Sequence, residues 1–374
     1  MIDEVGHDGG RPPIPPASIL PARREPPLFD EFPRLRSVLP WRPIVHAPTP
    51  VEPCVSPWIG RDGVFHKRDD RVSPLYGGNK VRRFEYLFAD AERKGARSLV
   101  TVGGLASTQV MATILFGRRF GFAVHTVLFD QPVTSFARSA VLTDVAGGGH
   151  VVRGGGYLAT TVRTLLALRR AERPYLILPG ASSALACLGY VDAMLELGEQ
   201  VRRGEVPRPD VIVVPAGSGG TLAGLAVGAR LLRWPTVVIG VRITELLACN
   251  RVTVRLRIRA TMRFLEKHAG RSLGLRSGDA RFALYHGAIG KGYGHSTPDA
   301  IAAIPEVERL TGVPGEVTYS GKGLSGLRAV ARAHPRETVL YWHTLSSVRP
   351  DVPEIAPDAL DPAFADVFAG PVTI

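Results

Sequence analysis

Cysteine and lysine are scarce in this chain of 374 residues, and it has no long apolar run. Its three cysteines, Cys54, Cys187 and Cys249, are far apart and odd in number, which excludes a disulfide framework and a CxxC metal site. No stretch approaches about 18 uninterrupted apolar residues. The opening MIDEVGHDGG lacks the basic start and apolar core of a secretion signal. We therefore expect a cytosolic protein that binds no membrane and no metal.

The basic charge is carried almost entirely by arginine. The net charge is +12, yet charged residues make up only 21% of the chain and apolar ones 45%, so the chain can bury a sizeable core. Arg251, Arg255, Arg259 and Arg263 are spaced to line one face of a helix, which is typical of a solvent-exposed surface. No zinc-finger, RRM or aromatic-interleaved basic pattern accompanies them, so we expect no nucleic-acid partner.

Short β-branched runs alternate with amphipathic stretches after a proline- and glycine-rich segment, residues 1–28, which is typical of a flexible arm. This alternation is typical of right-handed βαβ units with mostly parallel sheets, so the predicted class is α/β. Glycine-rich breaks near 148–156 and after Gly180 favour two sheets with a cleft between them. The predicted strands are 98–104, 123–129, 149–155, 175–181, 210–217, 236–243 and 338–344, and the predicted helices 79–95, 107–121, 132–147, 157–172, 183–203, 220–232 and 323–334.

One glycine-rich loop has the composition of an anion site. After the apolar run VIVVPA, and before an apolar helix, the chain reads Gly217, Ser218, Gly219, Gly220 and Thr221. Glycines let the backbone close around a phosphate at the helix N-terminus. The loop lacks the third glycine of a dinucleotide site, and no Walker sequence occurs, so a monophosphate is the expected ligand. A plain tight turn and a serine hydrolase, with Ser218 attacking and His343 as base, remain open alternatives.

An isolated lysine starts a helix in the string GGNKVRRFEYLF. The positive end of the helix dipole and the charges of Arg82 and Arg83 disfavour the ammonium form of Lys80 and lower its pKa. An unprotonated amine beside a phosphate site suits a pyridoxal phosphate enzyme, in which the amine binds the cofactor aldehyde and the phosphate anchors it. Taken alone, Lys80 is better explained as an exposed capping residue.

Several motifs in one order resemble those of the 1-aminocyclopropane-1-carboxylate deaminase and D-cysteine desulfhydrase family, which are fold type II pyridoxal phosphate enzymes. They are HKRDD (66–70), GGNK, a Gly/Ser loop after VGG, GSGGT, GYG and YSGK, and the resemblance runs from about residue 40 to 350. It implies that Lys80 holds the cofactor aldehyde, that Asn79 bonds its phenolic oxygen, and that Gly217 to Thr221 hold its phosphate with help from Arg83. The resemblance also implies a homodimer, a large domain of residues 29–80 and 190–374, and a small domain of residues 81–189.

The string GGLASTQVMAT follows a strand and opens a helix, so Ser107, Thr108 and Gln109 can offer donors to a substrate carboxylate. An ordinary N-cap serine is the alternative. The resembling family usually has QSN here, whereas this chain has Ala106, Ser107 and Thr108. The resemblance keeps Ser107 near the substrate α-carbon, while the pocket around it differs.

Two tyrosines complete the expected site. Tyr293 and Tyr319 match tyrosines that lie beside the cofactor in the family and move protons or stack on substrate; a plain core role is the alternative for each. Ser320 matches the partner of the pyridine nitrogen, where the deaminase branch has a glutamate, and a neutral hydroxyl there favours β-elimination. Leu345 and Ser346 stand where the family generally has glycines.

The expected reaction is removal of the α-proton by Lys80 or Ser107, loss of the β-substituent, and release of a 2-oxo acid and ammonia from a small amino acid such as D-cysteine. The departures from the family pattern leave 1-aminocyclopropane-1-carboxylate deamination, β-replacement and racemisation open. A serine hydrolase and a non-catalytic pyridoxal phosphate carrier are alternatives of other classes.

Overall fold

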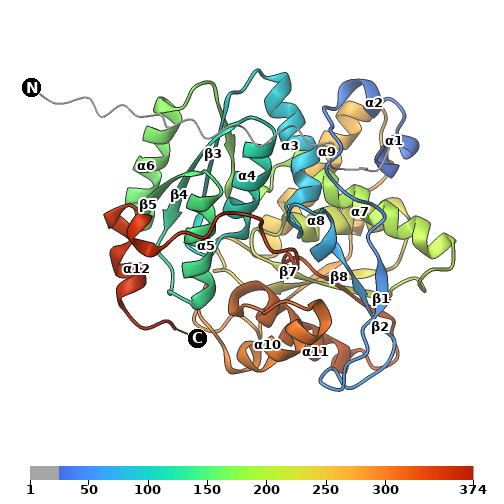
Figure 1. The fold of residues 1–374 in the computed structure, drawn as a ribbon. Coiled ribbons are helices and arrows are strands. Elements are labelled where there is room, and N and C mark those ends of the chain that lie inside the picture. Colours follow the sequence, from blue (N-terminus) through green and yellow to red (C-terminus); the bar gives the residue numbers. More distant parts are fainter. Residues whose placement is uncertain (1–24, 374) are drawn as a thin grey trace, which may run out of the picture.

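Two mostly parallel β-sheets, each flanked by helices, form the computed structural model, which describes residues 25–373 (Figure 1). The six-stranded sheet has the order β1-β2-β10-β7-β8-β9, in which only the β1–β2 pair is antiparallel. The four-stranded sheet has the order β5-β4-β3-β6 and is wholly parallel. The predicted α/β class with mostly parallel sheets is therefore confirmed.

The strands of the larger sheet come from two distant parts of the chain, whereas those of the smaller sheet follow one another. The larger sheet contains β1 (Val51–Pro53), β2 (Val64–Lys67), β7 (Val211–Ala216), β8 (Val237–Arg242), β9 (Phe282–Tyr285) and β10 (Val339–Trp342). The smaller contains β3 (Ser98–Gly104), β4 (Ala123–Phe129), β5 (His150–Gly155) and β6 (Pro174–Ile177). Because all but β1 run parallel, the carboxyl ends of each sheet lie along one edge, where ligands of α/β proteins bind.

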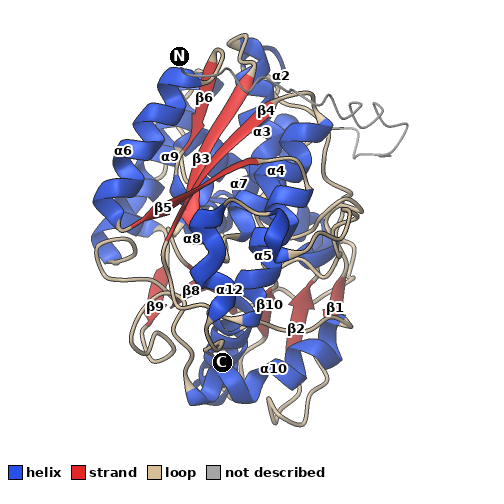
Figure 2. Cartoon of the chain, turned by 60° about the vertical axis from the view of Figure 1, so that its left-hand side comes forward, coloured by secondary structure: helices blue, strands red, loops and turns tan. Residues whose placement is uncertain are grey.

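Helices cover both faces of each sheet (Figures 1 and 2). On the larger sheet, α8 packs on one face of β7 and β8, and α11 packs on the other. On the smaller, α4 packs against β3 and β4, while α6 contacts β3, β4 and β5. The helices are α1 (Pro27–Glu31), α2 (Leu35–Val38), α3 (Val81–Arg93), α4 (Thr108–Arg119), α5 (Ser135–Ala146), α6 (Tyr157–Arg170), α7 (Ala184–Arg202), α8 (Gly220–Leu231), α9 (Arg251–Ala269), α10 (Pro298–Thr311), α11 (Lys322–Ala333) and α12 (Ala365–Ala369). None of the helices within residues 25–373 is long and apolar enough to span a membrane.

All seven predicted strands and all seven predicted helices exist, although two strands are markedly shorter than predicted: the run 338–344 forms a strand only over Val339–Trp342. The run 175–181 ends as a strand at Ile177, because Pro179 has no N–H for the ladder and Gly180 has a φ of +74°. The prediction missed β1, β2 and β9, which are only three or four residues long. It also missed the short helices α1, α2 and α12 and helix α10, which contains Pro305, while α9 was indicated only by its arginine spacing. The four arginines of α9 are exposed, as expected. Residues 1–24 of the predicted arm lie outside the described residues, and α1 begins at Pro27. The domain boundaries stay predictions.

A buried network of charges ties the HKRDD segment to α3 and α7. The Glu196 carboxylate accepts hydrogen bonds from Lys67 Nζ at 2.7 Å and from Arg82 Nη1 at 2.9 Å. Arg82 also donates to both carboxylate oxygens of Asp69, at 2.8 and 2.9 Å, and Trp342 Nε1 donates to the same carboxylate at 2.7 Å. Two carboxylates thus balance two cations in the core, as buried charges require.

Replacing Glu196 by glutamine is expected to lower the free energy of unfolding by about 3–5 kcal/mol at neutral pH, because it leaves Lys67 and Arg82 with one buried counter-charge. Burial alone would raise the pKa of Glu196, but the Arg82 and Lys67 charges outweigh it and hold that pKa well below its ordinary value of 4.5. The wild-type advantage is therefore full above pH 4.5 and shrinks as the pH falls below it.

Denaturant titrations of the two proteins at several pH values measure this difference. The matched control is Glu199→Gln on the same helix, whose carboxylate is 34% exposed and 3.8 Å from its nearest cation; its effect should stay below about 0.5 kcal/mol. Equal effects of the two substitutions, or a difference that grows in acid, would contradict the assignment.

Candidate active site

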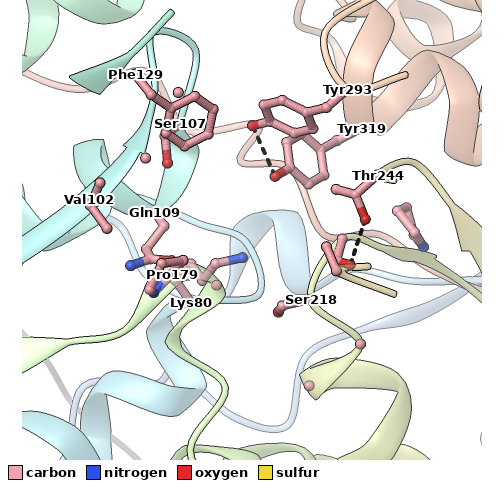
Figure 3. Close-up of a pocket in the computed structure, with 18 of the residues that line it drawn as sticks. Lys80, Val102, Ser107, Gln109, Phe129, Pro179, Ser218, Thr244, Tyr293 and Tyr319 are labelled. Carbon is pink, nitrogen blue, oxygen red and sulfur yellow. Dashed lines mark hydrogen bonds between the residues drawn. The ribbon is translucent and has the colours of Figure 1, made fainter. Parts of the chain in front are cut away.

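A cavity of about 350 Å³ lies between the two sheets and contains most of the predicted site residues. Figure 3 shows its two sides, with Ser107 and Phe129 on the side of the smaller sheet, Tyr293 and Tyr319 opposite, and Lys80 below them. The predicted residues that line it are Asn79, Lys80, Arg83, Ser107, Gln109, Gly217, Ser218, Gly219, Gly220, Thr221, Tyr293 and Tyr319. Segments far apart in the chain therefore meet at one place, at the carboxyl ends of β3 and β7.

The two glycines before Lys80 let the chain pass between neighbouring backbone segments. A Cβ at Gly77 would lie 1.8 Å from the carbonyl oxygen of Asp70, and one at Gly78 would lie 2.6 Å from the carbonyl oxygen of Thr344. Gly78 also has a φ of +89°, which favours glycine. The string GGNK is thus a close-fitting loop that fixes where Lys80 enters the cavity.

The amine of Lys80 is buried and has no carboxylate partner among the described residues. Its Nζ donates to Asn79 Oδ1 at 2.7 Å, and Asn79 Nδ2 donates to Thr221 Oγ1 at 3.0 Å. Burial, followed by the nearby charge of Arg83, holds the pKa of Lys80 well below its ordinary value. The sequence analysis predicted a lowered pKa for Lys80 from the helix dipole and the neighbouring arginines, but burial is the larger cause. A neutral amine is a nucleophile and a base.

A buried guanidinium faces the glycine-rich loop from the other side. Arg83 Nη2 donates to Thr221 Oγ1, while Nη1 donates to the carbonyl oxygens of Gly180 and Ala181. Its Nε has no partner within the described residues, and no carboxylate there pairs with it. Burial lowers its pKa. Helix α8 begins directly after Gly219, whose φ of +78° turns the chain. An unpaired buried cation at a helix N-terminus is a site for an anion.

The start of α4 brings polar groups to the smaller-sheet side of the cavity. Ser107 is its N-cap and accepts from the N–H of Val110 at 3.3 Å. Gln109 lines the cavity and donates from Nε2 to Thr101 Oγ1 at 2.8 Å. Thr108 is buried and is not among the lining residues, so only its backbone N–H, in the unpaired first turn, remains as a donor.

A pair of tyrosine hydroxyls closes the opposite side. The oxygens of Tyr293 and Tyr319 are 3.2 Å apart and hydrogen-bonded (Figure 3). Burial raises the pKa of Tyr319 to about 12, and it also holds the pKa of Tyr293 well above its ordinary value. Both hydroxyls are therefore protonated at neutral pH, and the pair can pass a proton into the cavity.

Lys322 of the YSGK string positions the loop that carries Tyr293. Its buried Nζ donates to the carbonyl oxygens of Ile289 at 2.8 Å and Gly292 at 2.9 Å. Glu245, which lines the cavity, accepts from the N–H of Tyr293 at 3.0 Å. Sequence reasoning named neither Lys322 nor Glu245 as a site residue, although the scarcity of lysine was a signal for the first.

The residues that depart from the family pattern do not line the cavity. They are Ala106, Thr108, Ser320, Leu345 and Ser346. The Ser320 hydroxyl bonds to the backbone of Glu316, donating to its carbonyl oxygen at 2.9 Å and accepting from its N–H at 2.8 Å. The Ser346 hydroxyl accepts from the N–H of Gly77 at 2.8 Å and so supports the loop before Lys80. The predicted role of Ser320 toward a pyridine nitrogen stays a prediction.

The hydrolase alternative lacks its base. Ser218 lines the cavity, and its hydroxyl bonds to the hydroxyl of Ser182. His343 is buried outside the lining and pairs with His66, with 2.9 Å between Nδ1 and Nε2. No histidine of residues 25–373 lines the cavity, and no group of three potential ligands in this part of the chain could hold a metal.

The outer wall of the cavity was not found from the sequence. Phe129 at the end of β4 contacts the rings of Tyr157 and Tyr293, with centroids 5.6 and 6.3 Å apart. Such residues have no motif; the position of Phe129 at the carboxyl end of a predicted strand was the only available signal. The other lining residues that the sequence analysis did not assign to the site are Val102, Gly103, Gly104, Thr160, Thr161, Pro179, Gly180, Pro215, Leu222, Thr244 and Ala248.

Known proteins share this architecture over most of the chain. The family model described as pyridoxal-phosphate dependent enzyme matches residues 44–344. A D-cysteine desulfhydrase of Klebsiella pneumoniae subsp. pneumoniae is 32% identical over 319 residues, covering 79% of this chain and 88% of its own. One of Yersinia enterocolitica is 34% identical over 310 residues, with the same coverage.

Solved structures agree at the level of the fold. The crystal structure of an ACC deaminase homologue superposes with a TM-score of 0.69 at 27% identity, covering 91% of this chain and 98% of that one. Maize serine racemase, at 16% identity and a TM-score of 0.55, shares the fold. The fold is that of the type II pyridoxal phosphate enzymes, and the chain belongs to the pyridoxal-phosphate-dependent enzyme family.

Proposed function

We propose that this protein is a lyase that eliminates the β-substituent of a small amino acid of the D-cysteine type and releases a 2-oxo acid and ammonia. The observation that carries the proposal is a single cavity that contains the buried amine of Lys80, whose pKa is lowered, and the buried guanidinium of Arg83, neither of which has a carboxylate partner among the described residues. The relatives named D-cysteine desulfhydrase support the substrate class. For D-cysteine and one water molecule, the products are pyruvate, hydrogen sulfide and ammonia.

The residues present fit pyridoxal phosphate. Arg83, the N-terminus of α8 and the hydroxyl of Thr221 would hold the phosphate, since the buried Arg83 has no other counter-charge among the described residues. Asn79 stands beside Lys80 and would bond the phenolic oxygen. Once the substrate amine has replaced the Lys80 amine at its aldehyde, the cofactor would withdraw electrons from the substrate α-carbon and make its proton acidic. The chain's own groups then have to bind the carboxylate and move protons.

Substrate binding and proton removal fall to Lys80 and the start of α4. The first-turn N–H groups at Thr108 and Gln109, with the Ser107 hydroxyl, would hold the α-carboxylate, because a helix N-terminus favours an anion. This fixes the α-carbon between Ser107 and Lys80. The free amine of Lys80, or the Ser107 hydroxyl, takes the α-proton as general base.

Departure of the β-substituent calls for a proton on the other side of the cavity. The hydroxyls of Tyr293 and Tyr319 lie there, and because both are protonated at neutral pH they can donate to a leaving thiolate. Because a tyrosine hydroxyl transfers a proton directly to it, the sulfur leaves as a neutral thiol and not as a charged thiolate beside apolar side chains. Tyr319 is also near the glycine-rich loop, because a Cβ at Gly217 would lie 3.8 Å from its hydroxyl oxygen. Tyr319 and Tyr293 would therefore act together as a proton relay.

We further propose that the protein works in the cytosol as a homodimer. Its cysteines are all free and buried, which suits a reducing compartment. The dimer is the assembly that the family resemblance implies.

Turnover tests the reaction class. Holoenzyme given D-cysteine should yield pyruvate, trapped as a hydrazone, with equal amounts of sulfide and ammonia, and Lys80→Ala should abolish it. 1-Aminocyclopropane-1-carboxylate and 3-chloro-D-alanine serve as parallel substrates. No 2-oxo acid from any of the three would contradict the eliminating function, and product from 1-aminocyclopropane-1-carboxylate alone would assign deamination instead.

Removing the Lys322 amine should displace Tyr293, while the cofactor should still bind in the cavity. Lys322→Met is expected to lower kcat by roughly 10- to 100-fold while cofactor affinity stays within about threefold, because the loop from Ile289 to Gly292 loses its two tethers. Lys94→Met, which changes a lysine with a 60% exposed side chain, is the matched control.

A double-mutant cycle tests whether Lys322 acts by positioning the Tyr293 hydroxyl or by a general effect on the fold. Tyr293→Phe alone should cost about 100-fold in kcat, yet only a few-fold more in the Lys322→Met background, since the hydroxyl is already out of place. Losses that simply multiply would contradict a shared role.

A further inference from the structure

A continuous band of aromatic rings lines the end of the active-site cavity away from Lys80. The ring of Phe129 contacts those of Tyr157 and Tyr293, with centroids 5.6 and 6.3 Å apart. The rings of Tyr293 and Tyr319 meet edge-on, with centroids 6.0 Å apart (Figure 3). All four side chains line the cavity, and we call these four residues the aromatic wall. The proton relay uses the hydroxyls of two of them and leaves the ring faces without a role.

The aromatic wall is formed at the ends of three neighbouring strands, where glycines give its rings room. Phe129 at the end of β4 pairs with Gly104 of β3 and with Gly155 of β5. A Cβ at Gly104 would lie only 3.1 Å from the rings of both Phe129 and Tyr293. At Gly155 and Gly156, by contrast, an added Cβ would have no neighbour in the described chain closer than 3.9 Å, apart from the adjacent residues. Open space therefore lies beside the Phe129 ring on the side of β5, and a group longer than a thiol can extend there.

The charges of the cavity disfavour an anionic group at the aromatic wall. The cations that line the cavity within residues 25–373 are Lys80 and Arg83, which the proposed function assigns to the cofactor aldehyde and phosphate. The carboxylate of Glu245 lies beside the wall, because it accepts from the N–H of Tyr293 at 3.0 Å. An anionic substituent such as a sulfonate would therefore meet a carboxylate and no free cation. The wall suits an uncharged, apolar group.

We propose that the aromatic wall binds an aromatic group carried on the sulfur of the substrate, and that the enzyme cleaves the Cβ–S bond of aromatic thioethers of D-cysteine, such as S-benzyl-D-cysteine. The inference rests on the proposed function, since it uses the same amine and the same proton relay. The sulfur of D-cysteine alone covers little of four rings. A benzyl ring beside Phe129 and Tyr157 would bury apolar surface and take the edge-to-face or offset-stacked arrangement that aromatic pairs prefer.

This reaction needs no oxidant and no reductant. Lys80 takes the α-proton, and the Cβ–S bond breaks with its electron pair on sulfur. The hydrogen-bonded hydroxyls of Tyr293 and Tyr319 supply the proton that this sulfur takes up. With one water molecule, S-benzyl-D-cysteine then gives pyruvate, ammonia and phenylmethanethiol, so that atoms and electrons balance. The tyrosine rings thus face the group whose departure their hydroxyls assist.

Turnover of three thioethers by the holoenzyme tests the aromatic wall. S-benzyl-, S-cyclohexylmethyl- and S-methyl-D-cysteine all lose an alkyl thiol, so their values of kcat/KM differ mainly through contacts of the substituent. The benzyl value should exceed the methyl value at least about 10-fold, because the ring fills an apolar site. It should exceed the cyclohexylmethyl value by roughly threefold or more, because that substituent has a similar size but no aromatic ring. Pyruvate trapped as its hydrazone measures all three, with D-cysteine as the reference.

Variants of the wall should change the ratio of the benzyl value to the methyl value. Phe129→Leu and Tyr157→Leu should each lower this ratio by about three- to tenfold, because each removes a ring and keeps an apolar side chain. The ratio is diagnostic, since loss of the Phe129 ring also removes a contact of Tyr293 and slows both substrates alike. Leu158→Ala is the matched control. Leu158 is 82% exposed, follows Tyr157 on α6 and lies outside the lining, so its replacement should leave the ratio within about twofold. Should Phe129→Leu not fold, Tyr157→Leu decides, because Tyr157 is 73% exposed.

The outcomes separate this inference from the proposed function. Cleavage of D-cysteine with a benzyl value no higher than the methyl or cyclohexylmethyl value would reject the inference and leave the proposed function standing. A ratio that both wall variants leave unchanged would reject it too. So would a higher kcat/KM for D-2,3-diaminopropionate, whose ammonium group would pair with Glu245. No 2-oxo acid from any of these compounds would overturn both.

Discussion

A chain of hydrogen bonds from Lys80 through Asn79 and Thr221 to Arg83 is the interaction on which the site depends. It joins the loop that carries the amine to the loop that begins α8, with 2.7 Å from Lys80 to Asn79 and 3.0 Å from Asn79 to Thr221. Burial without a carboxylate partner lowers the pKa of both Lys80 and Arg83. The same enclosure thus makes the amine reactive and leaves the guanidinium in need of an anion.

The buried network of charges around Asp69, Arg82 and Glu196 supports the loop that carries the Lys80 amine. Asp69 links HKRDD to Arg82 on α3 through its carboxylate, and its carbonyl oxygen accepts from the N–H of Gly78 at 2.7 Å. Lys80 starts the same helix two residues before Arg82. Neutralising one member of the network would therefore disturb both stability and the position of the amine. The motif HKRDD is a support for the site and contributes no group to the cavity.

Most of the fold and the centre of the site could be predicted from the sequence, because both depend on local patterns. Seven strands and seven helices follow from periodicity, and Lys80 and the Gly217 loop from residue types that the chemistry requires. What could not be predicted depends on tertiary contacts. Phe129 and Glu245 reach the cavity only because distant segments meet there, and β2 carries His66 and Lys67 in a strand too short for a periodic signal. The structure also places Ser320 and Ser346, two departures from the family pattern, outside the lining of the cavity, and no local pattern indicates this.

The central claim is that the Lys80 amine holds the aldehyde of pyridoxal phosphate. Borohydride reduction of the purified protein, followed by peptide mapping by mass spectrometry, tests it most directly. The account predicts loss of the visible absorption band and the mass of reduced cofactor on the peptide that contains Lys80, and on no peptide that contains Lys67 or Lys322. Reduced cofactor on either of those lysines, or protein purified without any vitamin B6, would contradict it.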